Sequence, residues 1–354
     1  MAENLSPFQS FIFISRYSRW IPEKGRRETW EECVGRWWNY FTDKVPQLAE
    51  RPDVKEAILN LEVLPSMRSL MTAGSALDHD NTCLYNCSYL PIDSVESFAE
   101  LFVILMNGTG VGYSVERQYT DKLPTVANKI EKTFHISYVV EDSKEGWGNA
   151  VKFLISHLYE GRHVKWDLSY IRPAGARLKT FGGRASGPAP LDNLFKFIVK
   201  LFYNAQGRKL TALECHDLCC AIANAVIVGG VRRSAMISLS DLSDREMALC
   251  KSGAWWEQAG FRSYANNSAI YRGRPPMGQF LEEWTSLYNS HSGERGMINR
   301  SALQSQAALW GRDEKCEYGT NPCAEIILKP FEFCNLSTVV VRPDDTAATL
   351  KKKI

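Results

Sequence analysis

The sequence predicts an α/β protein with a helical region at its N-terminus. From about Leu61 onward, short apolar runs, polar turns and amphipathic helices alternate, which is the pattern of helices packed on a sheet. Residues 1–60 are instead rich in aromatic and charged side chains at roughly helical spacing, including Trp30 and Trp37. We therefore expect a helical region over 1–60 and an α/β region over 61–354.

The composition excludes several classes of function. The chain has 354 residues, of which 45% are hydrophobic and 23% charged, and its formal net charge is +2. Because positive and negative charges nearly balance, the chain has no excess positive charge that would bind the phosphates of nucleic acid. We therefore expect no nucleic-acid partner. The apolar stretch 11–14 is too short for a signal peptide or a membrane span. We expect a cytoplasmic protein without membrane contact, whose ten cysteines are kept as thiols.

The clearest predicted helix spans residues 93–106. Asp93 is placed to cap it, and Glu96 stands where a capping-box partner belongs. Asn107 and Gly108 end this helix, and a buried strand over 110–115 follows. The further elements that we expect are helices at about 191–205 and 211–228, a strand over 337–342 and a helix beginning over 344–354.

Residues 321–325, Asn-Pro-Cys-Ala-Glu, are the sharpest local feature, and residues 333–336, Phe-Cys-Asn-Leu, follow them. If the first segment is extended, its amide, thiol and carboxylate lie on one side, because residues two apart in a strand point the same way. We expect a short turn to bring Cys334 back toward Cys323. The alternative is that both cysteines are buried small hydrophobic residues. A zinc site fits poorly, because the two cysteines are widely spaced and lack a nearby histidine.

These residues resemble the finger-loop signature of ribonucleotide reductase catalytic subunits, in the spacing of the adenosylcobalamin-dependent class. The family implies a ten-stranded α/β barrel, built as two five-stranded halves with the finger loop passing through the middle. The resemblance extends over nearly the whole chain in the family's order. The other segments that carry it are 16–26, Asn86-Cys87-Ser88, 171–176, 181–188 and 229–235.

The resemblance also implies roles for five residues. Cys323 would hold the thiyl radical that abstracts the ribose 3′ hydrogen. Glu325 would act as general base on the 3′ hydroxyl, and Asn321 would orient the sugar. Cys87 and Cys334 would supply the reducing equivalents and end each turnover as a disulfide.

Further residues correspond to positions that the family uses for recognition. Ser66, Asn86 and Gly110 stand where the family contacts substrate, although a turn serine and a strand glycine are ordinarily structural. The loop at 229–236, with Gly230, Arg232 and Arg233, corresponds to the loop that passes effector information to the substrate base; its arginines are otherwise surface charges. Asp93 and Arg117 lie near positions that bind the effector nucleotide in dimeric relatives. For Asp93, a role as helix cap is a complete alternative.

Cys215, Cys219 and Cys220, with His216, lie in one predicted helix and are better explained as buried core than as a metal site. We therefore expect no metal site in this chain. The glycine run at 108–112 does not predict a dinucleotide-binding loop, because Tyr113 stands where the last glycine is needed. This weakens the reading of the chain as an NAD-dependent oxidoreductase.

The resemblance implies a ribonucleotide substrate, a dNTP or ATP effector, a thioredoxin- or glutaredoxin-type reductant and adenosylcobalamin as radical source. A separate ferritin-like metal-binding subunit is the alternative source. The sequence does not distinguish diphosphate from triphosphate substrates. A non-catalytic nucleotide-binding or regulatory fragment of a reductase is the competing function.

The chain stops soon after Cys334, so most of the second half of the barrel is expected to be missing. It is either part of a longer protein or completed by a second polypeptide, because a half-closed barrel exposes strand edges and apolar surface. The insertion by which monomeric relatives imitate a partner subunit is expected to be absent between Asp121 and Trp166. This favours a homodimer.

Overall fold

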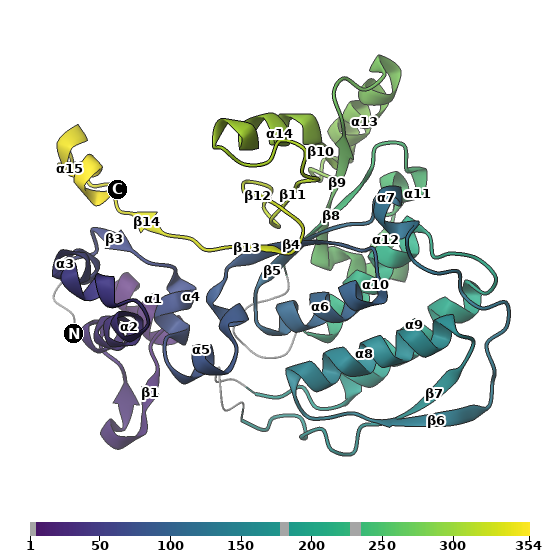
Figure 1. The fold of residues 1–354 in the computed structure, drawn as a ribbon, viewed down its shortest axis with the longest axis horizontal. Helices are drawn as coiled ribbons and strands as arrows, with labels where there is room; N and C mark the ends of the chain where they lie inside the picture. The colour runs from purple at the N-terminus through teal and green to yellow at the C-terminus, as the bar shows by residue number, and fades with distance from the viewer. Residues whose placement is uncertain (1–4, 178–183, 227–234) are drawn as a thin grey trace. The chain divides into compact units, whose positions relative to one another are not determined.

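The computed structural model describes residues 5–177, 184–226 and 235–354. They fall into two compact units (Figure 1). The first contains Met1–Asn86 and Asn335–Ile354, and the second contains Cys87–Cys334. Both members of the predicted dithiol, and the predicted finger loop, therefore lie in the second unit.

The first unit is mainly helical, and it extends beyond the region 1–60 for which the sequence predicts helices. A capping box between Thr29 and Glu32 begins α2, which buries Trp30 and Trp37. Its helices are α1 (Pro7–Arg16), α2 (Trp30–Lys44), α3 (Pro52–Leu59), α4 (Met67–Thr72), α5 (Ser75–His79) and α15 (Ala347–Lys353), with 3-10 turns at Pro22–Lys24, Pro46–Glu50 and Asn81–Leu84. Its strands form two antiparallel pairs, β1 (Trp20–Ile21) with β2 (Arg26–Arg27) and β3 (Val63–Leu64) with β14 (Thr338–Val339).

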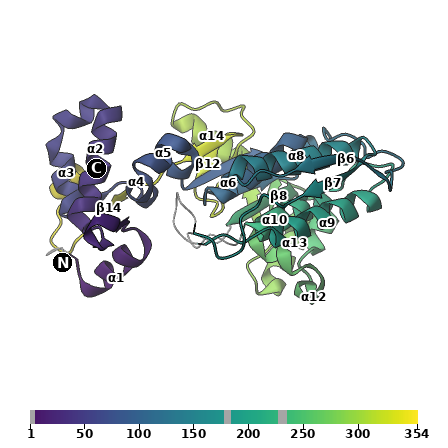
Figure 2. The same cartoon turned by 90° about the horizontal axis from the view of Figure 1, so that it is seen from below.

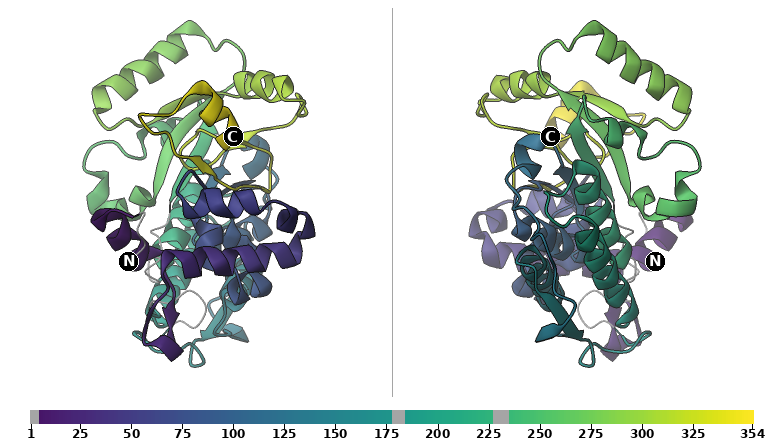
Figure 3. Two further views of the ribbon diagram at one scale, coloured as in Figure 1. Left: turned by 90° about the vertical axis from the view of Figure 1, so that its left-hand side faces the viewer. Right: turned by 90° about the vertical axis from the view of Figure 1, so that its right-hand side faces the viewer.

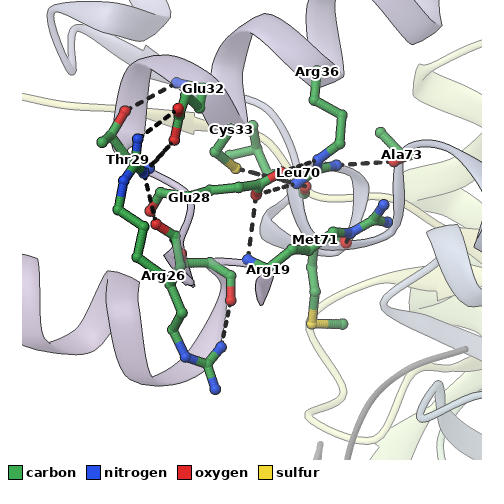
Figure 4. Close-up of polar contacts among 12 residues, drawn as sticks. Arg19, Arg26, Glu28, Thr29, Glu32, Cys33, Arg36, Leu70, Met71 and Ala73 are labelled. Carbon is green, nitrogen blue, oxygen red and sulfur yellow. Dashed lines mark hydrogen bonds and ion pairs between the residues drawn. The ribbon is translucent and has the colours of Figure 1, made fainter. Parts of the chain in front are cut away.

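Two arginines hold the carboxyl end of α4 (Figure 4). Arg36 donates to the carbonyl oxygens of Leu70 and Ala73, both at 2.9 Å, and Arg19 donates to that of Met71 at 3.0 Å. Glu28 pairs with Arg36 at 2.6 Å, so the arginine charge is balanced. These bonds satisfy carbonyls that the end of a helix leaves without partners.

The second unit is built on a six-stranded sheet in the order β10-β9-β8-β5-β4-β13. Its first five strands are parallel and only β13 runs antiparallel, against β4. The strands are β4 (Cys87–Pro91), β5 (Gly110–Ser114), β8 (Met236–Asp241), β9 (Ala265–Tyr271), β10 (Gly296–Asn299) and β13 (Glu332–Cys334). This α/β architecture with a mostly parallel sheet confirms the predicted fold class. The complete ten-stranded barrel stays a prediction.

Helices connect these strands, and α6, α8, α9 and α10 pack together beside the sheet (Figure 2). The helices of this unit are α6 (Val95–Met106), α7 (Arg117–Thr120), α8 (Lys144–Tyr159), α9 (Ala189–Asn204), α10 (Ala212–Ala225), α11 (Arg245–Leu249), α12 (Trp255–Ala259), α13 (Met277–Ser290) and α14 (Arg300–Leu309), with a 3-10 turn at Gly260–Tyr264. Figure 3 shows the fold in two further views. Two smaller pairs are β6 (Phe134–Val139) with β7 (His163–Asp167) and β11 (Gly319–Thr320) with β12 (Ile327–Leu328).

Alternation along the strands gives the sheet two different faces. Val111 and Tyr113 of β5 belong to the large core formed with the helices. Gly112, which lies between them, faces the β11–β12 hairpin instead, since a Cβ added there would meet Thr320. The sheet therefore buries one face under helices and presents the other to the hairpin.

Several predicted elements have different ends. The N-cap of α6 is Ser94, whose hydroxyl accepts a hydrogen bond from the Ser97 amide at 3.3 Å. The predicted cap at Asp93 and the capping box with Glu96 are therefore wrong. The helices predicted at 191–205 and 211–228 are confirmed as α9 and α10. The strand predicted over 337–342 is limited to β14, because only Thr338 and Val339 pair with β3.

The interpretation of the cysteine-rich helix as core is confirmed. Cys215, Cys219 and Cys220 are fully buried in α10, and Nδ1 of His216 lies 2.8 Å from the hydroxyl of Tyr113. Burial lowers the pKa of His216 to about 3, so the ring is neutral. Within the described ranges, no cluster of three or more potential ligands for a metal ion occurs. No helix in those ranges has the length and apolar character to span a membrane.

Candidate active site

Cys87 and Cys334 are brought together by the pairing of β4 with β13. They are direct partners in the antiparallel register, so their side chains lie on the same face of the sheet. Residues paired in this way have Cα atoms about 4.5–5.5 Å apart, which is within the range that a disulfide spans. Both side chains are buried. The hydrogen bond with Cys87, together with burial, raises the pKa of Cys334 well above its usual range.

The predicted finger loop is the turn of the β11–β12 hairpin, and we call residues 319–328 the finger hairpin. The backbone amide of Asn321 donates to the carbonyl of Ile326 at 3.2 Å, and the amide of Ile326 donates to the Asn321 side-chain oxygen at 3.0 Å. Between them Ala324 adopts a left-handed backbone with φ of 65°. The segment therefore turns, and the extended conformation considered from the sequence is wrong.

The side chain of Asn321 joins the other groups of the site. Its Nδ2 donates to Oε1 of Glu325 at 2.8 Å and lies 3.7 Å from the sulfur of Cys87. Asn321 itself is fully buried, whereas Cys323 and Glu325 are exposed. The amide thus fixes the carboxylate next to the dithiol, while the thiol at the turn stays accessible.

Three glycines allow the finger hairpin to lie directly on the sheet. A Cβ on Gly112 would stand 1.8 Å from the carbonyl oxygen of Thr320, and one on Gly110 would stand 2.9 Å from Cγ of Pro322. On the hairpin side, a Cβ on Gly319 would stand 2.1 Å from the ring of Tyr89. The glycine run that fails as a nucleotide-binding loop therefore has a packing role. A direct contact of Gly110 with substrate stays a prediction.

The site lies at the amino ends of the parallel strands. Cys87 begins β4 and Gly110 begins β5, and the two are partners in register. Asp93 and Arg117 follow the carboxyl ends of the same strands, so they lie at the opposite edge of the sheet. Asp93 pairs with Lys122 at 3.4 Å, and the Arg117 amide donates to the Asp241 carboxylate at 2.9 Å. Their effector role stays a prediction.

The other predicted recognition residues are placed only in part. Ser66 and Asn86 belong to the first unit, where the Ser66 hydroxyl lies 2.8 Å from Oδ1 of Asn86 and accepts from the amide of Arg68 at 3.2 Å. Gly230, Arg232 and Arg233 lie outside the described residues. The next described residue is Ala235, whose carbonyl oxygen accepts from the Val111 amide at 3.0 Å.

Arg300, a residue that no sequence motif marks, is 1% exposed and holds the base of the finger hairpin. Its guanidinium binds both carboxylate oxygens of Glu116 at 2.6 and 2.5 Å, and its Nε donates to the carbonyl of Tyr318 at 3.0 Å. Burial lowers the pKa of Arg300, but the hydrogen bond and the negative charge of Glu116, with smaller contributions from Tyr89 and Tyr119, together outweigh this effect and leave the pKa raised. A single arginine after an apolar strand gives no sequence signal for this contact.

Comparison with known proteins gives consistent relatives. Residues 110–202 match a family described as the insertion domain of B12-dependent ribonucleotide reductase. Adenosylcobalamin-dependent ribonucleoside-triphosphate reductases of Levilactobacillus brevis and Lactobacillus leichmannii are each 29% identical over 91% of this chain, and that of Lactobacillus acidophilus is 28% identical over the same share. A crystal structure of a B12-dependent (class II) ribonucleotide reductase matches 97% of this chain with a TM-score of 0.78 and 26% identity.

These matches cover only part of each relative. The chain spans 53% of the length of the curated relatives and 56% of the solved chain. The match to the insertion domain counts against the expectation that the whole of this insertion is absent. Part of the L. brevis reductase's matched region nevertheless has no counterpart here, since the alignment of 402 positions is longer than the 354 residues of this chain. The homodimer prediction loses the argument on which it was based.

Proposed function

The chain is a homologue of the class II, adenosylcobalamin-dependent ribonucleotide reductases, and from this premise we propose that it carries the radical and reducing groups of such an enzyme. The observation that carries the proposal is the Asn321 amide, which lies within reach of both the Glu325 carboxylate and the Cys87 thiol. The partner of Cys87 across the sheet is Cys334. Three kinds of reactive group thus converge on one edge of the sheet.

The proposed reaction converts a ribonucleotide and a dithiol into a 2′-deoxyribonucleotide, a disulfide and water. Cys323, as thiyl radical, removes the 3′ hydrogen atom and returns it at the end. Glu325 takes the proton of the 3′ hydroxyl, which promotes loss of the 2′ hydroxyl as water. Cys87 and Cys334 supply two electrons and two protons and become a disulfide, which a thioredoxin- or glutaredoxin-type protein then reduces. Asn321 orients the sugar and Glu325 together.

The exposed position of Cys323 fits a radical that originates outside this chain. A buried thiol, such as those of α10, has no such access. Adenosylcobalamin supplies the initial radical when it is bound, and the B12-dependent relatives favour it over a separate metal-binding subunit. Cys323 is the residue of this chain that meets the radical source, and the described residues include no further group that we assign to holding it.

The rest of the reductase is proposed to complete the site. The five parallel strands β4, β5, β8, β9 and β10 support an assignment to one half of the family's ten-stranded barrel. The remaining half, a bound dNTP or ATP effector and a homodimer are kept as proposals. Di- and triphosphates are both candidate substrates.

The test is a single turnover of the reductase that contains this chain, pre-reduced and given CDP or CTP with and without adenosylcobalamin. We expect deoxynucleotide only with the cofactor, in step with a Cys87–Cys334 disulfide identified by mass spectrometry. The variant Cys323→Ser should form neither product, because serine does not hold the radical. Its matched control is Cys316→Ser, a half-exposed cysteine shortly before the finger hairpin, which should retain turnover.

The alternative functions give different results. Product formed without cobalamin and lost with a metal chelator would assign the radical to a separate subunit. A chain that binds nucleotides but forms no product or disulfide would be a regulatory fragment, and the proposal would be abandoned.

A further inference from the structure

We propose that Arg300 is a positioning residue that sets the register of the finger hairpin on the sheet and thereby the place of Cys323. The inference rests on the proposed function of that hairpin. Arg300 touches none of the proposed reacting atoms. It binds the backbone at the base of the hairpin, and it acts through that backbone on the turn.

Arg300 joins three separate parts of the second unit. It is the first residue of α14, immediately after β10. Its guanidinium binds Glu116, which follows the end of β5, and the carbonyl of Tyr318, which immediately precedes β11. A further bond at 3.1 Å reaches Glu317. One buried side chain therefore fixes the start of the hairpin relative to two strands of the sheet.

Glu116 is itself held rigidly. It is 4% exposed, and the hydroxyl of Ser114 donates to its Oε2 at 2.7 Å. A buried, bidentate pair of arginine and carboxylate has a defined geometry, because the planar guanidinium matches the two oxygens. Lysine would keep the charge but could not bind both carboxylate oxygens and the Tyr318 carbonyl in one plane.

From this base the hairpin follows the sheet toward the dithiol. Gly319 packs on Tyr89, Thr320 lies over Gly112, and Pro322 lies over Gly110. Gly112 is the third residue of β5 and Gly110 the first, so the hairpin runs from the carboxyl edge of the sheet to the amino edge. Cys323 is five residues beyond Tyr318, and a slip of one residue at the base corresponds to about 3.3 Å along a strand. Errors of about 1 Å in a reacting group can cost about 100-fold in rate.

The chain offers a matched control in the same unit. Arg295 is 4% exposed and binds Glu283 through Nε and Nη2, both at 2.8 Å, and it also bonds to Ser240 and to two carbonyls. None of these contacts reaches the finger hairpin. Arg295→Lys therefore has a similar effect on a buried ion pair, without touching the base of the hairpin.

The experiment compares Arg300→Lys with Arg295→Lys in the reductase that contains this chain. Hydrogen exchange of the Asn321 and Ile326 amides, which close the turn, reports the hairpin independently of catalysis. For Arg300→Lys we expect faster exchange there and a fall in kcat of at least about tenfold, with KM nearly unchanged. For Arg295→Lys we expect faster exchange near α13 and unchanged exchange in the hairpin. If Arg300→Lys does not fold, Glu116→Gln tests the same contact with a smaller change.

Unchanged exchange of the hairpin in a folded Arg300→Lys or Glu116→Gln protein would overturn the proposal. So would equal losses of kcat in Arg300→Lys and Arg295→Lys, because the effect would then be one of general stability. Faster exchange confined to the hairpin, in a protein that is inactive even as wild type, would support the positioning role and count against the proposed function alone.

Discussion

At the scale of single residues, the reactivity of Cys334 is set by its neighbour. The hydrogen bond with Cys87 is the largest cause that raises the pKa of Cys334, and burial is the next. The thiol proton of Cys334 is held more tightly in the folded protein than in the unfolded chain, where the pKa of a thiol is about 8.5. The contribution of this thiol to stability is therefore present below that value and is lost as pH rises above it.

We predict that alkylation of Cys334 in the folded, reduced protein still rises between pH 7 and pH 9 without a plateau, because little thiolate is present in that range. In Cys87→Ala the pKa of Cys334 should fall, so that a plateau comes into view. If Cys87→Ala only made Cys334 more accessible, the alkylation rate would rise by the same factor at every pH. Quantitative mass spectrometry of the alkylated peptide measures both profiles, and an unchanged profile in Cys87→Ala would contradict the prediction.

The residues of the site were largely predictable one by one, but their geometry was not. The motif around Cys323 and the later Cys334 predicted the reactive groups, whose roles stay predictions, and the structure places Cys334 opposite Cys87. The turn at Ala324 was missed, because the same residue types are compatible with an extended segment and with a turn. Arg300 was missed because its partners are Glu116 and Tyr318, and the contact with Glu116 depends on tertiary structure.

At the scale of elements, the glycines of β5 show how a sheet accommodates a second layer of backbone. We predict that Gly112→Ala displaces the finger hairpin, because the added Cβ would stand 1.8 Å from the backbone carbonyl oxygen of Thr320. A backbone atom cannot move aside as the end of a flexible side chain can. Overpacking of this kind costs about 1–3 kcal/mol. The free energy of unfolding, measured with urea, and hydrogen exchange of residues 319–328 should both show the change.

The control is Gly278→Ala in α13, where the added Cβ meets nothing within 4 Å. Alanine is the better helix former by about 1 kcal/mol, so this variant should be neutral or more stable. If Gly112→Ala proved as stable as Gly278→Ala with unaltered exchange in the hairpin, the close approach of Thr320 would have no energetic role.

The elements that the sequence specifies are those that local signals define. The amphipathic helices α9 and α10 and the glycine-led strand β5 were predictable, since hydrophobic periodicity and turn residues define them locally. The cap of α6 was assigned to Asp93 instead of Ser94, because both are good capping residues and their order alone does not decide. The length of β14 was overestimated, because the apolar run in the sequence extends beyond the two residues that pair with β3.

At the scale of the whole chain, the first unit is assembled from both ends of the sequence. Strand β14 pairs with β3, the Val340 amide donates to the carbonyl of Glu62 at 2.9 Å, and Arg342 donates to that of Asn60 at 2.9 Å.

We predict that deletion of residues 335–354 raises hydrogen exchange at β3 and the neighbouring end of α3, because these groups lose their partners. A deletion of 347–354 alone removes α15 but keeps β14 and Arg342, and it should leave β3 protected. Exchange in β5, which these residues do not pair with, should be unchanged in both deletions. If β3 exchanged equally fast in the two deletions, α15 rather than β14 would be the part of the C-terminal segment that stabilises this unit.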